Sequence, residues 1–171
     1  REIIYRGMAD EDWGLNPSLA RCNNIDQNLE YNLVNNFITI APAEFAELNT
    51  SFELLSKMQH YGLPTRLLDF TTNPLIALFF ACSDLVDKKD ARIVCHRAFV
   101  KIAKDEIIEN ICGTFNNYYF DDMTLDKINI PAYTYLLKLY RSKDDRILIA
   151  RPSFWNKRIQ NQEAVFMIFP N

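Results

Sequence analysis

Three groups of polar side chains, far apart in the sequence, have residue types that can bind or act on an anionic ligand. The first group is a single residue, Arg6, which follows an apolar segment and precedes a glycine. A guanidinium can donate two parallel hydrogen bonds to a phosphate or a carboxylate, so Arg6 is a candidate anion-binding residue. The alternative from its position alone is an arginine on the surface at the end of a strand.

The second group surrounds a turn made by Gly62 and Pro64, which we expect to be structural residues. His60 and Arg66 flank this turn, and one hypothesis is that they bind an anionic or polar ligand together. The alternative is that His60 caps helix carbonyls and Arg66 pairs with Asp69, which makes Asp69 structural as well. We expect His60 in the last turn of a helix, where the carbonyl dipoles favour a cation.

The same group continues into Thr71, Thr72 and Asn73, which open an apolar helix expected over residues 74–84. The amides and the partial positive charge of a helix N-terminus attract anions such as phosphate. The commoner use of these residue types is N-capping, here by Thr71 or Thr72. The helix is apolar on nearly every side, and this pattern predicts a helix that is buried in the core.

The third group, Arg158, Gln162 and Glu163, precedes the last expected strand. An amide and a carboxylate at this position can orient a hydroxyl or stabilise developing positive charge, whereas the alternative is a solvated turn. Neighbours on a strand point to opposite faces, so Gln162 and Glu163 cannot both face one cleft. Gln162 and Phe166 lie an even number of positions apart, which favours Gln162 as the inward residue.

Composition limits the function classes. The chain has 171 residues, of which 49% are hydrophobic, and this suits one domain with a substantial core. Its net charge of -3 argues against a nucleic-acid partner held by phosphate contacts. No apolar run reaches the roughly 20 residues that span a bilayer, and no signal peptide is recognisable. The chain begins at Arg1 on a strand-like segment, so we expect a domain excised from a longer chain.

The four cysteines form no Cys-x-x-Cys pair, and the two histidines, His60 and His96, do not supply a second pair of ligands. This spacing predicts no metal site. Four free thiols in a domain of this size are typical of a reducing compartment, so we expect a cytoplasmic protein. The lack of a long apolar run leads us to expect no membrane partner.

Short apolar segments and amphipathic segments follow one another irregularly along the chain. Strands are expected near residues 2–6, 66–70, 92–100, 146–150 and 164–169. Helices are expected near residues 29–38, 51–60, 74–84, 104–112 and 133–140. Without regular strand–helix–strand alternation, the pattern favours an α+β fold with short mixed or antiparallel strands and a buried central helix.

Four segments resemble the FRG domain, a bacterial family named after a Phe-Arg-Gly motif. They are Tyr5-Arg6-Gly7, Pro17-Ser18-Leu19-Ala20-Arg21, residues 59–82 with the pattern Gln-His-x-Gly-x-Pro-Thr-Arg-Leu-Leu-Asp-x-Thr, and Arg158-Ile159 with Gln162-x-x-Val165-Phe166. The first motif has Tyr where the family has Phe, which keeps an aromatic ring. Glu163 and Ala164 follow Gln162 where many relatives carry a glycine nearby. The resemblance covers most of the chain and implies a single FRG-like domain over residues 1–171.

The order of elements is also similar to that of the ADP-ribosyltransferase superfamily. This resemblance implies an NAD-dependent ADP-ribosyltransferase or NAD-cleaving effector of bacterial phage defence or toxin systems, with NAD as substrate. Catalytic residues would then be Arg6, Thr71 and Gln162 or Glu163. Ligand-binding residues would be Arg6, His60, Arg66, Thr72 and Arg158. The alternative is a non-catalytic sensor of a nucleotide or another anionic ligand, which signals to a fused or partner domain outside this chain.

Overall fold

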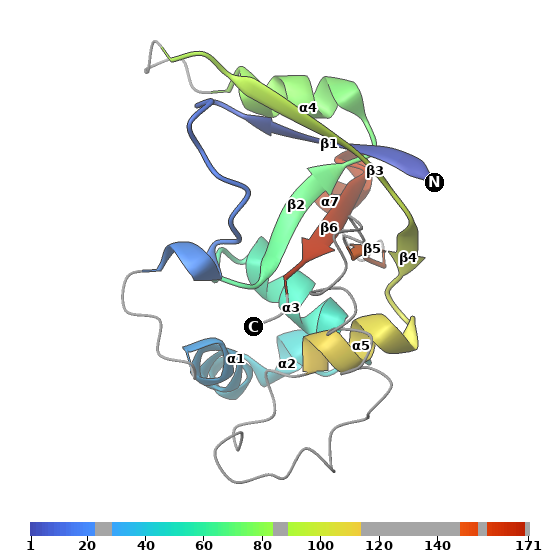
Figure 1. The fold of residues 1–171 in the computed structure, drawn as a ribbon. Helices are drawn as coiled ribbons and strands as arrows, with labels where there is room; N and C mark the ends of the chain where they lie inside the picture. Colours follow the sequence, from blue (N-terminus) through green and yellow to red (C-terminus); the bar gives the residue numbers. More distant parts are fainter. Residues whose placement is uncertain (23–28, 84–88, 114–147, 154–156, 170–171) are drawn as a thin grey trace, which may run out of the picture.

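The computed structural model describes residues 1–22, 29–83, 89–113, 148–153 and 157–169. Within these ranges, six strands form one curled sheet in the order β3-β1-β2-β6-β5-β4 (Figure 1). The strands are β1 (Glu2–Met8), β2 (Leu67–Thr71), β3 (Arg92–Ala98), β4 (Val100–Ile102), β5 (Ile149–Arg151) and β6 (Ala164–Ile168). β4 and β5 are parallel, whereas the other neighbouring strands are antiparallel.

Helices lie at both ends of this sheet. The described helices are the 3-10 helix η1 (Leu19–Arg21) and the α-helices α1 (Leu29–Ile40), α2 (Pro42–Phe45), α3 (Ser51–His60), α4 (Pro74–Ala81), α5 (Glu106–Cys112) and α7 (Lys157–Asn161). Figure 1 shows α4 against β1 at one end of the molecule, with α1, α2, α3 and α5 together at the other. This arrangement confirms the predicted α+β class with short, mainly antiparallel strands. The helix predicted over residues 133–140 lies outside the described residues.

None of the described helices combines the length and the apolar character that crossing a membrane requires. The sheet separates two clusters of buried side chains. One cluster lies on the side of α3 and includes Phe52 and Leu67, and the other includes Leu68 and Phe70. Because side chains alternate along β2, Asp69 points to the same side as Leu67, towards α3.

The C-terminus of α3 ends as the sequence predicts. Gly62 has a φ of +87°, a left-handed conformation in which glycine avoids the strain of a side chain. The amide of Gly62 donates to the carbonyl of Gln59 at 2.9 Å, and the amide of Leu63 donates to that of Met58 at 3.1 Å. These two bonds form a Schellman motif, which ends the helix at His60 and turns the chain back towards β2.

α4 is not buried, contrary to the prediction. Ala77 and Ala81 are buried against β1, whereas Leu75, Leu78 and Phe79 are 72%, 47% and 68% exposed. The apolar pattern predicted burial on every side. The sheet covers only the face of α4 that carries the two alanines, and Leu75, Leu78 and Phe79 lie outside that contact.

The sequence predicted a strand that ends before Gly7, whereas β1 continues through Gly7 to Met8. Gly7 instead allows the close approach of α4. A Cβ atom added at Gly7 would lie 1.8 Å from the carbonyl oxygen of Ala77 and 2.8 Å from the amide nitrogen of Ala81. Both are backbone atoms of the helix, so only a residue without a side chain fits this position.

Candidate functional site

A cavity of about 370 Å³ lies between β1, β2 and β6 on one side and the C-terminal half of α3 and α7 on the other. The polar residues that line it are Arg6, Ser56, Gln59, His60, Asp69, Thr71, Ser83, Arg158 and Gln162. The aromatic residues that line it are Tyr5, Trp13, Phe70, Phe80 and Phe166. The structure therefore brings members of all three polar groups in the sequence to one cavity.

Arg6 is held at the cavity by one of its guanidinium nitrogens. Its Nη1 donates to the backbone carbonyl of Asp69 at 2.6 Å, whereas its Nε is buried and has no hydrogen-bond partner among the described residues. Burial lowers the pKa of Arg6, the Asp69 carboxyl opposes this shift, and the positive charge of Arg21 adds to it. Leaving a buried donor unsatisfied costs about 1–3 kcal/mol, so a ligand that offered an acceptor to Nε would remove this cost.

Asp69 supplies a carboxyl group to the cavity. Its Oδ2 accepts a hydrogen bond from Nε2 of Gln59 at 2.8 Å. Although solvent reaches Asp69 through the cavity, the surrounding protein partly desolvates the carboxyl and raises its pKa. The charge of Arg6, the hydrogen bond from Gln59 and the charge of Arg158 act in the opposite direction. The residue expected to be structural thus also lines the candidate site.

Thr71 connects the end of β2 to the turn before β6. Its buried hydroxyl donates to the carbonyl of Gln162 at 2.7 Å and accepts from the amide of Asn73 at 3.0 Å. The N-cap of α4 is Asn73 and not a threonine, because the Asn73 side chain accepts from the amide of Leu75 at 3.0 Å. Thr71 therefore fixes the position of Gln162 by a hydrogen bond to the backbone carbonyl of Gln162.

Gln162 and Glu163 are not strand residues, although the sequence-based prediction treated them as neighbours on a strand. They form a turn between α7 and β6, and Glu163 has a φ of 45°. The Glu163 carboxylate accepts from the hydroxyl of Thr72 at 3.1 Å and from Nδ2 of Asn73 at 2.9 Å. The Glu163 side chain thus occupies the start of α4, where the sequence suggested a phosphate-binding site. Of the two neighbours, Gln162 lines the cavity and Glu163 does not.

His60 and Arg158 lie at the side of the cavity opposite the sheet. Burial lowers the pKa of His60, and the positive charge of Arg158 lowers it further. The neutral imidazole is therefore favoured, although the position at the end of α3 predicted a cation. Arg158 is the positive charge that α7 brings to the cavity.

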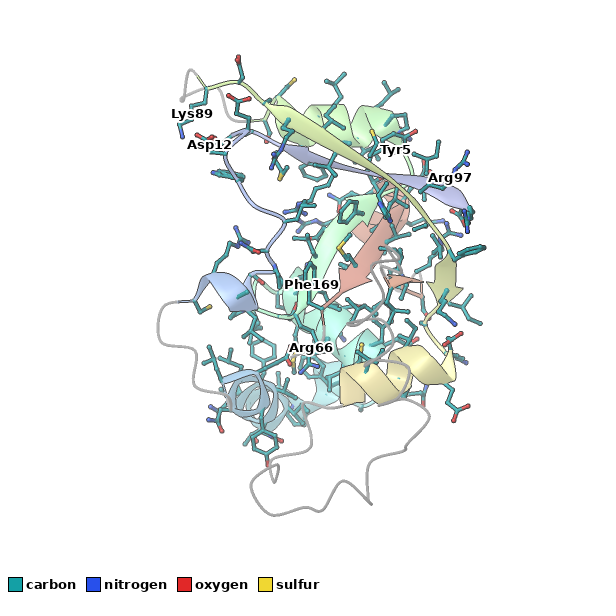
Figure 2. All side chains as sticks on the ribbon, viewed as in Figure 1. Tyr5, Asp12, Arg66, Lys89, Arg97 and Phe169 are labelled. Carbon is teal, nitrogen blue, oxygen red and sulfur yellow. The ribbon has the colours of Figure 1, made fainter. Side chains whose placement is uncertain are left out.

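Arg66 does not belong to the cavity lining. It is enclosed beside α1 and α5, where it forms an ion pair with Glu30 and its Nη1 donates to the carbonyl of Ile111 at 3.2 Å. Figure 2 shows Arg66 towards the end of the molecule away from Tyr5. The predicted pair between Arg66 and Asp69 is wrong, because Glu30 takes the place of Asp69. Arg66 is a structural residue of the core.

Sequence reasoning missed several residues of the cavity. Ser56 and Gln59 are polar residues one helical turn apart on α3, and they line the cavity together. This spacing was a usable signal, because both fall on the face of α3 that packs on the sheet. Trp13 and Phe80 also line the cavity, but isolated aromatic residues carry no comparable signal.

The chemical groups of the cavity are guanidinium, imidazole, carboxyl, amide and hydroxyl groups. Among the described residues, no three His, Cys, Asp or Glu side chains are placed to hold a metal ion. The cysteines are free thiols, and none of them lines the cavity. Burial raises the pKa of the Cys112 thiol well above its ordinary value. This set of groups is suited to binding and orienting a polar, negatively charged molecule.

The fold and the cavity define an α+β domain whose polar motifs converge on one ligand-sized site. A family model described as the FRG domain matches residues 1–90, and the chain belongs to this family. The matched part carries Arg6, His60, Asp69 and Thr71, whereas Gln162 lies beyond it. No curated protein and no solved structure matches the chain.

Proposed function

We propose that the cavity binds a nucleotide-like anionic ligand, and that NAD is its substrate, cleaved at the bond between nicotinamide and ribose. The observation that carries this proposal is the buried Nε of Arg6, which has no partner among the described residues. A ligand oxygen would satisfy this donor, and phosphate oxygens suit the geometry of a guanidinium. Arg158 adds a second positive charge to the same cavity.

The rest of the lining suits the other parts of a nucleotide. Tyr5, Trp13 and Phe80 offer rings on which a base or the nicotinamide ring can stack. Gln162 offers an amide for the hydroxyls of a ribose. The volume of about 370 Å³ falls within the range of small-molecule sites.

In this proposal the chain's own residues act by binding and orientation. Arg6 holds the pyrophosphate, while Gln162, fixed through Thr71, orients the ribose next to nicotinamide. Such positioning lowers the barrier to attack on the ribose carbon by a protein acceptor or by water. Attack by a protein acceptor gives ADP-ribosyl transfer, and attack by water gives NAD hydrolysis; nicotinamide leaves in both. Either would suit an effector of bacterial phage defence or a toxin that depletes NAD in the cytoplasm.

A non-catalytic sensor is the second candidate, and the position of Glu163 favours it. The Glu163 carboxylate is bound to Thr72 and Asn73 at the start of α4 instead of lining the cavity. A transferase that relied on this carboxylate to stabilise positive charge would need it beside the ligand. A sensor needs only the affinity that Arg6 and Arg158 provide, and it would signal to a fused or partner domain.

Replacing Arg6 with Lys is expected to weaken ADP-ribose binding about tenfold or more, because charge-assisted hydrogen bonds contribute about 1.5–3 kcal/mol each. Lysine keeps the positive charge but loses the Nε donor and the planar fork. Binding is measured by isothermal titration, and nicotinamide release from NAD is measured by chromatography. Arg97→Lys is the matched control, because Arg97 is exposed on β3 and does not line the cavity.

Nicotinamide release by the parent protein, reduced in Arg6→Lys and retained in Arg97→Lys, would support NAD cleavage at this cavity. Binding of ADP-ribose without any nicotinamide release would favour the sensor. Equal binding by both lysine variants would contradict the role of Arg6.

A further inference from the structure

A carboxyl group in a cavity that binds anions needs a physical reason, because a carboxylate repels an anionic ligand. Asp69 is that carboxyl. Leu68, its neighbour on β2, is buried on the other side of the sheet and does not line the cavity, whereas Asp69 does. Its backbone carbonyl accepts from Nη1 of Arg6 at 2.6 Å, and the charges of the two side chains interact. Arg6 and Asp69 therefore lie close together in the lining of the cavity.

A chain of hydrogen bonds sets the orientation of this carboxyl. Ser18 Oγ accepts from the amide of Thr65 at 3.0 Å, and the Thr65 hydroxyl oxygen accepts from the amide of Leu67 at 3.2 Å. The Thr65 hydroxyl proton is then donated to Oε1 of Gln59. This leaves Nε2 of Gln59 to donate to Oδ2 of Asp69, at 2.8 Å.

This series of hydrogen bonds links polar residues of separate motifs and ends at the cavity. Thr65 is almost fully buried, with an exposure of 1%, so the first part of the chain is fixed by packing. Asp69, at the other end, remains accessible to solvent. A contact that only joined α3 to β2 would have no need to end at an accessible carboxyl. A carboxyl that is already oriented loses little freedom when a ligand binds to it.

We infer that Asp69 is a further ligand-binding residue, whose carboxylate accepts hydrogen bonds from the hydroxyls of a sugar, and that Gln59 positions it. This inference rests on the proposed function and narrows the ligand to a phosphorylated sugar, with phosphate on Arg6 and hydroxyls on Asp69. Carboxylates accept hydrogen bonds from ribose hydroxyls in other nucleotide sites. Inorganic pyrophosphate has no sugar hydroxyls and carries a larger negative charge than ADP-ribose, so the carboxylate repels it more than it binds it.

Titration of ADP-ribose and of inorganic pyrophosphate against the same variants tests this inference. Asp69→Asn is expected to weaken ADP-ribose binding about tenfold, the loss of one charge-assisted hydrogen bond, and to leave pyrophosphate binding unchanged or tighter. Gln59→Met is expected to weaken ADP-ribose binding less and to leave pyrophosphate binding unchanged. Asp105→Asn is the control, because Asp105 pairs with Lys101 and does not line the cavity.

The ratio of the two affinities separates ligand binding from a structural role. A fall in affinity for both ligands by the same factor in Asp69→Asn, or no change for either, would overturn the inference. If the parent binds neither ligand, the inference and the proposed function fail together. If the ratio changes as expected but NAD is not cleaved, the inference holds and only the catalytic part of the proposed function fails.

Discussion

Replacing Glu30 with Gln is expected to lower the free energy of unfolding by about 3–5 kcal/mol, because Arg66 then keeps a buried charge without a counter-charge. The Arg66 and Glu30 side chains have exposures of only 1% and 2%. Glu30 Oε2 accepts from Nε of Arg66 at 2.8 Å, and Oε1 accepts from the backbone amide of Arg66 at 3.1 Å. The ion pair therefore joins α1 to the start of β2. Denaturant unfolding measures the loss.

Glu2→Gln is the matched control for Glu30→Gln. Glu2 pairs with Arg151 at 2.6 Å, but these side chains are 45% and 38% exposed. Such exposed pairs contribute about 0–1 kcal/mol. Replacing Glu30 and Arg66 together with Met is expected to recover most of the loss, since an apolar pair needs no counter-charge. A loss for Glu30→Gln no larger than for Glu2→Gln would contradict the structural role of Arg66.

Replacing Gly7 with Ala is expected to lower the free energy of unfolding by about 1–3 kcal/mol, the usual cost of overpacking. The added Cβ would lie 1.8 Å from the carbonyl oxygen of Ala77. A backbone atom cannot rotate away as a side chain can, so α4 must move from β1. Because Arg6 precedes Gly7 and Phe80 lies on α4, the movement should also weaken ADP-ribose binding. Unfolding and titration measure the two effects.

Gly113→Ala is the control for the alanine substitution itself. A Cβ atom at Gly113 would lie 3.5 Å from Oγ of Ser51, an ordinary van der Waals contact. We expect little change in stability for this variant. A Gly7→Ala protein that unfolds at the same denaturant concentration as Gly113→Ala would show that the packing of α4 on β1 is looser than described.

Local features of the fold could be predicted from the sequence, whereas the pairing of distant residues could not. The turn at Gly62 follows from a glycine and a proline next to a helix, so neighbouring residues suffice to predict it. The partner of Arg66 lies 36 positions away, at Glu30. Nothing in the local pattern separates Glu30 from Asp69 as that partner. The exposure of α4 was missed for a similar reason, since an apolar pattern does not identify what covers a helix.

The candidate site was predicted in its location more than in its detail. Arg6, Arg158 and Gln162 were expected to bind or act on the ligand, and they line one cavity. The left-handed conformation of Glu163 could not be predicted, because that conformation is uncommon for residues other than glycine. It turns the Glu163 side chain to Asn73 and so determines which of the two neighbours lines the cavity.

The most direct test of the central claim is a crystal structure of the protein with ADP-ribose. We predict that ADP-ribose lies in the cavity, with a phosphate oxygen within hydrogen-bond distance of Nε of Arg6. We also predict that a ribose hydroxyl lies within the same distance of the Asp69 carboxylate. ADP-ribose bound elsewhere on the molecule, or bound in the cavity with Nε of Arg6 still unpartnered, would contradict the claim.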